Sequence, residues 1–353
     1  MKILVLPGDG IGPEITAATV TVMRAASQRF DLGLTFAEEL VGHASLKRHG
    51  TTVRPELQQA AQDADGIVLG PTATLDFQDP LRGEINPSAF FRRRLDLFAN
   101  IRPARTYRGV SGPVGEFDLV VVRENTEGFY ADRNVESGSS EMLITHDVVV
   151  SLRRITRLCC ERIARAAFEL ARRRRRHVTI VHKANVMKLG DGMFNEECRK
   201  VAKEFPEIAV DDVIVDAMMA HVVRKPQRFD VIVTSNMYGD ILSDLTAELS
   251  GSLGLGGSLN AGSRYAMAQA AHGSAPDIAG RDIANPFSLI LSAALLLDWL
   301  GRTKDNRACE AAAAAIEAAV DAAIGAGDVT PDVGGKLGTR ATGDKLAARL
   351  VAA

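Results

Sequence analysis

The sequence predicts an α/β fold built on a largely parallel β-sheet, and three observations support this prediction. Short runs rich in β-branched residues alternate with helical patterns along the chain. Polar residues follow several of these runs, at positions where the loops of a parallel sheet carry chemistry. The length of 353 residues exceeds the commonest size of a single domain, so two domains with a cleft between them are expected.

Six runs are short and apolar enough to be buried strands. They are Ile3–Leu6, Gly66–Leu69, Phe117–Val122, Val178–Val181, Asp212–Val215 and Val231–Thr234. Helical patterns are seen over Pro13–Gln28, Thr145–Arg172 and Asp191–Phe205, and an Ala-rich helix is predicted over Asn306–Ile324. No internal repeat or low-complexity linker interrupts this order.

The charge balance gives no general attraction for nucleic acid or anionic membranes, because 42 Lys and Arg face 44 Asp and Glu. The N-terminal run Met1–Leu6 leads into a Pro-Gly turn and not into a signal-peptide cleavage site. No apolar run reaches the ~18–20 residues that span a bilayer, and Leu289–Leu300 is closer to a buried core helix. We therefore expect a soluble, cytoplasmic protein.

The cysteines have no CxxC spacing and are expected to be reduced, mostly buried thiols: Cys159, Cys160, Cys198 and Cys309.

Arg172–Arg176 is a run of five consecutive arginines. Taken alone it could be a nucleic-acid patch. The absence of interleaved aromatic residues favours a solvated helix end before the strand at Val178, where cations complement the helix dipole. RNA or DNA binding stays open as the less favoured alternative.

Two acidic residues, Asp240 and Asp244, follow the predicted strand Val231–Thr234. On a helix, a spacing of four places both carboxylates on one face, about 5–6 Å apart at Cβ. Two like charges this close suggest a bound hard cation, Mg²⁺ or Mn²⁺ rather than Zn²⁺. A helix N-terminus that favours acidic residues is the alternative. Asp216, after another apolar run, is a candidate third carboxylate.

Glycine-rich segments occur at three places. Gly8–Glu14 superficially resembles a dinucleotide-binding loop, but its G-x-G-x-G spacing is wrong, so a structural turn is favoured. Gly254–Gly257 is interpreted as a flexible loop. His272–Gly280, followed by Asn285, consists of small residues that allow close approach to a planar ligand, and Asp277 could accept hydrogen bonds from a ribose.

Several basic residues and one tyrosine are candidates for binding and catalysis. Arg92, Arg102 and Arg123 would suit a di- or tricarboxylate if they converged, because guanidinium groups bind carboxylates in bidentate fashion. Tyr130 could donate a proton, and Lys183, just past a predicted strand, could act as a base. Ordinary surface positions remain the alternative for each of them.

Taken together, these segments resemble the metal-dependent β-decarboxylating dehydrogenases, the isocitrate and isopropylmalate dehydrogenase family. The likeness runs from Gly8–Glu14 through Asn236–Asp244 and His272–Gly280 to Thr330–Gly338. It implies an isopropylmalate-dehydrogenase-like two-domain α/β fold. The discontinuous large, cofactor-binding domain would cover 1–97 and 250–353, and an inserted substrate-, metal- and dimer-forming domain would cover 98–249.

The resemblance also implies a homodimer with shared active sites. Asp216 and Lys183 would reach the partner's site, where Asp216 joins Asp240 and Asp244 in binding Mg²⁺ or Mn²⁺. The three arginines would bind the carboxylates of a small hydroxy acid. Lys183, assisted by Asn185, would take the hydroxyl proton, and Tyr130 would protonate carbon after CO₂ leaves. The implied cofactor contacts are Thr72, His272, Gly273, Ser274, Ala275, Asp277, Ile278 and Asn285.

The same resemblance suggests the choice of cofactor. Related NADP enzymes carry a cationic and an aromatic residue where this chain has Asp277-Ile278. A carboxylate there would repel a 2′-phosphate, so NAD is expected.

Substrate choice is less determined. Isopropylmalate enzymes usually place leucines at the positions of Ser88 and Ala89, and homoisocitrate enzymes can place arginine at that of Ala89. Isocitrate enzymes use Ser and Asn at the positions of Asn86 and Ser88, so isocitrate is favoured, followed by D-malate or tartrate. The missing leucines cost roughly 1–3 kcal/mol of apolar discrimination, which leaves 3-isopropylmalate as an alternative.

One departure from the family pattern is Gln269-Ala270, where a Glu-Pro pair is common. Loss of the glutamate is expected to alter how the nicotinamide is held or how protons leave the site.

A remote alternative for the whole chain is a catalytically weak regulatory or RNA-binding paralogue. The complete set of candidate arginines, aspartates, lysine and tyrosine argues against it.

Overall fold

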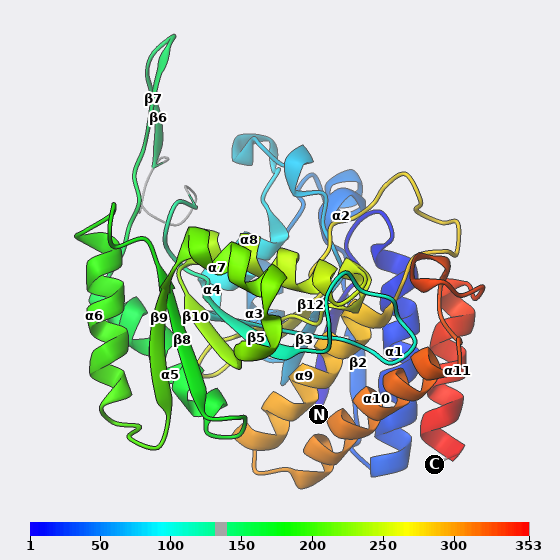
Figure 1. The fold of residues 1–353 in the computed structure, drawn as a ribbon. Helices are drawn as coiled ribbons and strands as arrows, with labels where there is room; N and C mark the ends of the chain where they lie inside the picture. Colours follow the sequence, from blue (N-terminus) through cyan, green and yellow to red (C-terminus); the bar gives the residue numbers. More distant parts are fainter. Residues whose placement is uncertain (131–139, 353) are drawn as a thin grey trace.

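A ten-stranded mixed sheet runs through the whole molecule (Figure 1). The computed structural model describes residues 1–130 and 140–352. The strand order is β2-β1-β3-β12-β11-β4-β5-β10-β8-β9. Pairs on both sides are parallel, whereas β11 and β4 at the centre pair antiparallel with their neighbours. The predicted α/β class with a largely parallel sheet is confirmed.

Every strand predicted from the sequence is present, with ends shifted by up to three residues. The large sheet contains β1 Lys2–Leu6, β2 Thr35–Glu38, β3 Gly66–Leu69, β4 Ala99–Arg105, β5 Asp118–Glu124, β8 His177–His182, β9 Ala209–Ile214, β10 Val231–Thr234, β11 Leu259–Ala261 and β12 Ala266–Gln269. A separate hairpin contains β6 Glu141–Thr145 and β7 Val148–Ser151.

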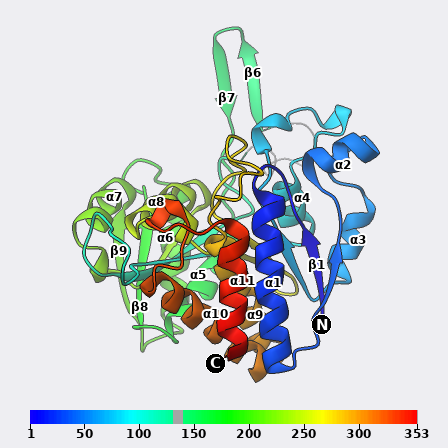
Figure 2. The ribbon, with the colours of Figure 1, turned by 90° about the vertical axis from the view of Figure 1, so that its right-hand side faces the viewer.

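Helices cover both faces of the sheet (Figures 1 and 2). They are α1 Gly12–Phe30, α2 Gly42–His49, α3 Glu56–Gln62, α4 Pro87–Arg94, α5 Arg157–Ala171, α6 Gly190–Ala202, α7 Val215–Arg224, α8 Asn236–Leu249, α9 Phe287–Thr303, α10 Arg307–Gly325 and α11 Thr339–Ala352. The long core helix expected at Leu289–Leu300 lies within α9, where most side chains are buried.

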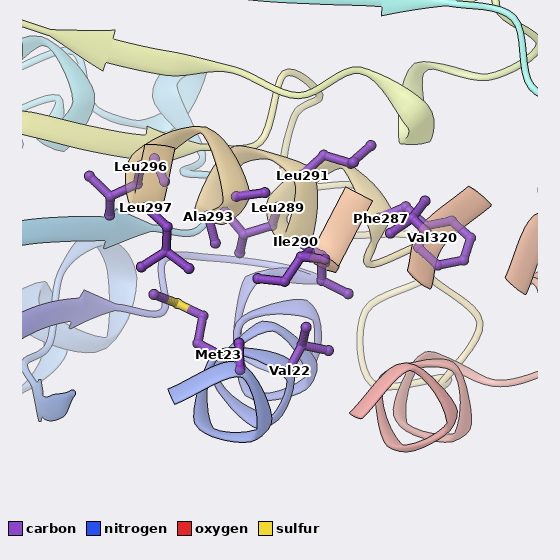
Figure 3. Close-up of a cluster of buried hydrophobic side chains, with 14 of the residues drawn as sticks. Val22, Met23, Phe287, Leu289, Ile290, Leu291, Ala293, Leu296, Leu297 and Val320 are labelled. Carbon is purple, nitrogen blue, oxygen red and sulfur yellow. The ribbon is translucent and has the colours of Figure 1, made fainter. Parts of the chain in front are cut away.

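Alternating side chains of each strand pack into separate hydrophobic cores on the two faces of the sheet. In β1, Ile3 and Val5 pack with α1, α9, α10 and α11, whereas Leu4 and Leu6 pack with α3, α4 and Val41, the residue before α2. Figure 3 shows part of the first core, between α1 and α9. In β5, Val120 and Val122 pack with α5 and α6, and Leu119 and Val121 pack with α7 and α8. Successive side chains of a strand point to opposite faces of the sheet, so the strand register determines which of them can face the site.

The prediction of a helix beginning at Thr145 is wrong. The segment from Glu141 to Ser151 forms the β6–β7 hairpin, and α5 begins only at Arg157. The run Val148–Val150 favours a strand because its side chains are β-branched. Thr156 caps α5 by accepting a hydrogen bond from the Cys159 amide. The hairpin projects from the body of the molecule (Figures 1 and 2).

A smaller correction concerns Asp216. The predicted strand Asp212–Val215 ends at Ile214, and Val215 already begins α7. Asp216 therefore lies in the first turn of a helix and not at a strand end.

The run Arg172–Arg176 forms the turn that follows α5, as the helix-end interpretation predicts. Arg174 forms ion pairs with Asp118 and Asp230, and Arg172 pairs with Glu169 and Glu207. Within the described residues, no helix combines the length and apolarity that crossing a bilayer requires. All four cysteines are free and buried, as predicted.

Candidate active site

A cavity of about 280 Å³ gathers many of the residues that the sequence singled out. It lies where α4, β4, β5, α8 and the segments after β3 and β12 meet. The predicted residues that line it are Thr72, Asn86, Ser88, Arg92, Arg102, Arg123, Tyr130, Asp240, His272 and Gly273. A larger surface hollow of about 1040 Å³ beside residues 106–118 contains none of them. Chemistry, not size, therefore identifies the candidate site.

The strand register brings Arg102 and Arg123 together. Asn100 pairs directly with Arg123 across β4 and β5, and Arg102 lies two residues further along β4, so all three point to one face. Arg102 donates from Nε to Asn100 Oδ1 at 2.7 Å and from Nη1 to Ser243 Oγ at 2.8 Å. The guanidinium group of Arg102 is thus held in a fixed orientation by two neutral acceptors, one on β4 and one on α8.

Arg123 is 1% exposed and is the largest fully buried side chain described. Its Nε and Nη2 atoms donate to Asn236 Oδ1 at 2.9 and 2.7 Å. Gly239 leaves room for it, because a Cβ at Gly239 would lie 2.6 Å from Arg123 Cγ. Burial, with repulsion from Arg123, lowers the pKa of Arg102. Adjacent buried cations of this kind favour an anionic ligand.

The two carboxylates of α8 converge as their spacing predicts. Arg102 Nη1 lies 3.3 Å from Asp240 Oδ1 and 3.0 Å from Asp244 Oδ1. One cationic nitrogen thus already contacts both acids. Carboxylate oxygens are the ligands that a hard dication prefers, and here two of them lie close together.

Tyr130 joins the same network. Its hydroxyl donates to Asp240 Oδ2 at 2.5 Å and accepts from Arg123 Nη2 at 2.8 Å. Arg123 also forms an ion pair with Asp240. The phenol oxygen is therefore held at the cavity wall between a cation and an anion.

The environments of the two acids push their pKa values apart. Burial alone would raise the pKa of Asp240, but attraction from Arg123 and Arg102 and the hydrogen bond from Tyr130 outweigh it, so the pKa is lowered. For Asp244 burial prevails over attraction from Arg102, and the pKa is raised. Asp244 is therefore the acid that first takes up a proton as the pH falls.

Lys183, Asn185 and Asp216 do not line the cavity of their own chain. Lys183 Nζ instead forms an ion pair with Asp216 of α7. Among residues 1–130 and 140–352, no three His, Cys, Asp or Glu side chains gather where they could hold a metal. One chain thus brings together two of the three carboxylates that the sequence suggested.

Most of the residues predicted to contact the cofactor lie in the loop after β12, and Thr72 follows β3. Thr72 Oγ1 and His272 Nε2 are buried and have no hydrogen-bond partner in the described part of the chain. Burial lowers the pKa of His272 and so favours the neutral ring. Two orphaned polar atoms on one cavity suit a ligand with hydrogen-bonding groups, as a nicotinamide dinucleotide has.

The first glycine segment supports this loop, as expected of a structural turn. Ile11 N donates to Ser274 O at 2.8 Å, and a Cβ at Gly10 would lie 1.9 Å from that carbonyl oxygen. Asn285 holds the start of α9 by accepting from Phe287 N at 2.9 Å. The other predicted cofactor residues lie along the loop beyond the cavity lining: Ser274, Ala275, Asp277 and Ile278.

Several residues that position this site were missed in the sequence. They are Asn100, Ser243 and Asn236, which orient the arginines; Asp191, which binds the backbone amide of Lys183; and Asn260, which binds Gln269. The sequence contained one signal for them, since Asn236 and Ser243 lie in the same short segment as the two aspartates. The remainder are brought close only by the fold.

Comparisons with known proteins agree with this arrangement. A family model described as isocitrate/isopropylmalate dehydrogenase matches residues 2–346. The chain is 40% identical over 356 residues to the 3-isopropylmalate/3-methylmalate dehydrogenase of Methanocaldococcus jannaschii, with 99% of this chain and 98% of that protein covered. It is 42% identical over 341 residues to the isocitrate/homoisocitrate dehydrogenase of Thermus thermophilus, with 96% of each covered.

A solved structure shares the fold. Isocitrate dehydrogenase from Methylococcus capsulatus superposes with a TM-score of 0.86 at 38% identity, and 99% of both chains is covered. The fold and these relatives together define an oxidative decarboxylating dehydrogenase. The chain belongs to the isocitrate/isopropylmalate dehydrogenase family, which confirms the resemblance seen in its sequence.

Proposed function

We propose that this enzyme uses NAD⁺ to oxidise and decarboxylate a (2R)-2-hydroxy acid that carries a carboxylate on carbon three, with isocitrate as the favoured substrate. The observation that carries the proposal is the convergence of Arg92, Arg102 and Arg123 with Asp240 on one cavity. Three guanidinium groups suit a ligand with several carboxylates. The alternatives are 3-isopropylmalate and D-malate or tartrate.

The predicted metal site has a donor set that fits Mg²⁺ or Mn²⁺. Asp240 and Asp244 would be joined by the partner subunit's Asp216. When bound, the cation would polarise the substrate hydroxyl and stabilise the negative charge that develops as CO₂ leaves. Within one chain, Arg102 bridges these two acids.

Proton transfer is assigned to side chains of this chain and its copy. The partner subunit's Lys183, assisted by Asn185 of the partner subunit, would accept the hydroxyl proton. NAD⁺, when bound, would supply the hydride acceptor. Tyr130 would then donate its phenolic proton to carbon. The hydrogen bonds of Tyr130 to Arg123 and Asp240 support this role, because they fix the phenol oxygen at the cavity wall.

The wall that would face the third carbon favours a small or polar group. Ser88 is buried and donates from Oγ to Gln269 Oε1 at 3.1 Å. Asn86 caps α4, since its Oδ1 accepts from Ala89 N at 3.1 Å. Neither residue offers the apolar surface that an isopropyl group would bury. The names of the two relatives described above include both kinds of substrate.

We propose a homodimer formed by the domain over 98–249, with 1–97 and 250–353 as the large domain. Exposed apolar side chains on that part of the chain support this. Ile241 of α8 is 56% exposed, and the β6–β7 hairpin exposes Leu143, Ile144 and Val149. Apolar surface of this kind is typical of interfaces. The pairing would also bring Lys183 and Asp216 to a second chain's cavity.

An NADH absorbance screen tests the proposed function. The substrates are (2R,3S)-isocitrate, 3-isopropylmalate, homoisocitrate, D-malate and tartrate, each with Mn²⁺ and either NAD⁺ or NADP⁺. We expect the highest kcat/KM with isocitrate and NAD⁺, because Asp277 would repel a 2′-phosphate. The variant K183M is the matched inactive control. Preference for NADP⁺ would refute the cofactor assignment, and turnover of no substrate would refute the activity.

A further inference from the structure

Arg162 of α5 lies beside the boundary proposed between the large domain and the domain over 98–249. Its Nη1 atom lies 2.9 Å from Asp96 Oδ1 and 2.7 Å from Asp96 Oδ2. Its Nη2 atom donates to Thr126 Oγ1 at 2.8 Å. The guanidinium carbon lies 4.5 Å from the centre of the Phe98 ring, within the range of a cation–π contact. One side chain thus contacts residues on both sides of the proposed boundary.

The contact with Asp96 reaches the segment that carries Arg92. Asp96 follows the C-terminal cap of α4 with a φ of 48°, a left-handed conformation that aspartate adopts more readily than most residues. The next residue, Leu97, donates from N to Arg92 O at 2.9 Å. The carboxylate that Arg162 holds is therefore part of the turn that fixes the end of α4.

The contact with Thr126 reaches the segment that carries Arg123. Thr126 lies just beyond the end of β5, and its hydroxyl accepts from Arg162. The same hydroxyl donates to Glu124 Oε1 at 2.5 Å, and the Thr126 amide donates to that oxygen at 2.8 Å. Glu124 is buried and is the last residue of β5. Arg162 is therefore connected, through Thr126, to the strand end that presents Arg123 to the cavity.

The two segments carry arginines that would bind the same hydroxy acid. Arg92 belongs to the proposed large domain and Arg123 to the domain over 98–249, and both line the cavity. A ligand bound by both guanidinium groups requires them at one separation. A contact that fixes this separation beforehand lowers the cost of ordering the two groups on binding. Arg162 is not among the residues that line the cavity, so it can act on the ligand only through these segments.

We propose that Arg162 is a positioning residue that joins the two domains at Asp96 and Thr126. It thereby sets the separation of Arg92 and Arg123 and increases the affinity for the hydroxy acid. The inference rests on the proposed function and names a determinant of binding at the same site. The loss on removing Arg162 should be confined to the hydroxy acid, because every residue predicted to contact NAD⁺ belongs to the large domain.

Three variants break this connection in different ways. R162M removes both polar contacts. D96N removes the ion pair from the other side, and asparagine also tolerates a positive φ, so the turn after α4 is kept. R162K keeps a cation beside Asp96, but an ammonium group does not reproduce the rigid fork with which a guanidinium reaches two acceptors.

R165M is the matched control. Arg165 lies one turn further along α5, is partly exposed, and pairs with Glu161 and Glu204. Both partners belong to the same proposed domain as α5, so this substitution removes an arginine without releasing a contact between domains. Thermal unfolding of each variant checks that it is folded.

Binding is measured by calorimetry on the full-length protein with Mg²⁺ and one ligand at a time, so that no turnover occurs. The ligands are isocitrate, 3-isopropylmalate and NAD⁺. R162M and D96N should each weaken the hydroxy acids at least about threefold and leave the affinity for NAD⁺ unchanged. The double variant D96N/R162M should be no weaker than R162M, because the two substitutions break one contact. R162K should lie between R162M and the unsubstituted protein, and R165M should change no affinity.

Unchanged affinity of R162M for the hydroxy acids that the unsubstituted protein binds would overturn the inference and leave the proposed function intact. An equal loss of affinity for NAD⁺ would do the same, because it would show a general loss of structure. Failure of the unsubstituted protein to bind either hydroxy acid would overturn the proposed function, and the inference with it. If R162M did not fold, D96N would decide, and unchanged affinity for the hydroxy acids in that variant would overturn the inference.

Discussion

Asp240 and Asp244 lie one turn apart on α8 and differ in how they hold protons. Arg123 and Arg102 prevail over burial at Asp240 and lower its pKa, whereas burial prevails at Asp244 and raises its pKa. A proton competes with a metal for the same carboxylate oxygens. In the proposed metal site, Asp244 is therefore the carboxylate through which pH should control metal binding.

Mn²⁺ affinity measured by electron paramagnetic resonance of the free ion tests this assignment. As pH falls from about 7 to about 5, affinity should weaken, because a raised pKa starts protonation of Asp244 above the ordinary range for aspartate. D244N should bind at least about tenfold more weakly at neutral pH and show a flatter pH dependence. An affinity that is the same in both proteins would contradict the role of Asp244.

Asp191 supports Lys183 from inside the protein. It is 1% exposed, its Oδ2 accepts from Lys183 N at 2.6 Å, and its Oδ1 lies 2.5 Å from Arg153 Nη1. Removing one partner of a buried ion pair leaves the other charge uncompensated. D191N should therefore lower the free energy of unfolding by about 3–5 kcal/mol, measured by urea denaturation.

The same substitution should also lower kcat, because the backbone that carries Lys183 loses an anchor. D211N, on the partly exposed ion pair with Arg228, is the control and should change stability by less than about 1 kcal/mol. Unchanged stability and kcat in D191N would show that Asp191 does not position Lys183.

Elements whose pattern is simple were predictable from the sequence. The buried runs at Gly66–Leu69 and Val231–Thr234 match β3 and β10 residue for residue. Strand β4 was missed because Asn100 and Arg102 interrupt its apolar pattern, and these are residues that the site uses. The hairpin was missed because it has no buried face to impose a period on its sequence.

The β6–β7 hairpin is expected to take part in the contact between two chains. An isolated two-stranded ribbon is marginally stable in water, so its exposed apolar residues should gain from contact with a second chain. Replacing Leu143, Ile144 and Val149 with serine should shift the protein toward monomer and make activity fall on dilution. Sedimentation velocity measures the first effect and progress curves at low enzyme concentration the second.

Val351→Ser is the matched control for the hairpin, because this side chain is also exposed but lies on α11, outside 98–249. It should leave both readouts unchanged. A hairpin variant that stays as dimeric and as active as the original would rule out this surface as part of the interface.

For the whole molecule, the sheet decides which distant residues meet. Arg92, Arg123, Asp240 and His272 come from separate parts of the sequence and line one cavity. The residue types and the family resemblance were sufficient to predict this group. Asn100 was not predictable as a partner of Arg102, because an asparagine in a strand gives no sign of the side chain that it contacts. Asn236 was signalled only by its place in the same segment as Asp240 and Asp244.

The central claim is that carboxylates from two copies of the chain hold one hard dication beside the hydroxy acid. Within one chain, Lys183 and Asp216 pair with each other away from the cavity. The claim therefore requires a second chain to supply them.

Anomalous diffraction from crystals grown with Mn²⁺ tests this claim most directly. The account predicts a manganese peak bound by Asp240, with the partner subunit's Asp216 among its ligands. No peak beside Asp240, or a peak there with the partner subunit's Asp216 pointing elsewhere, would contradict it.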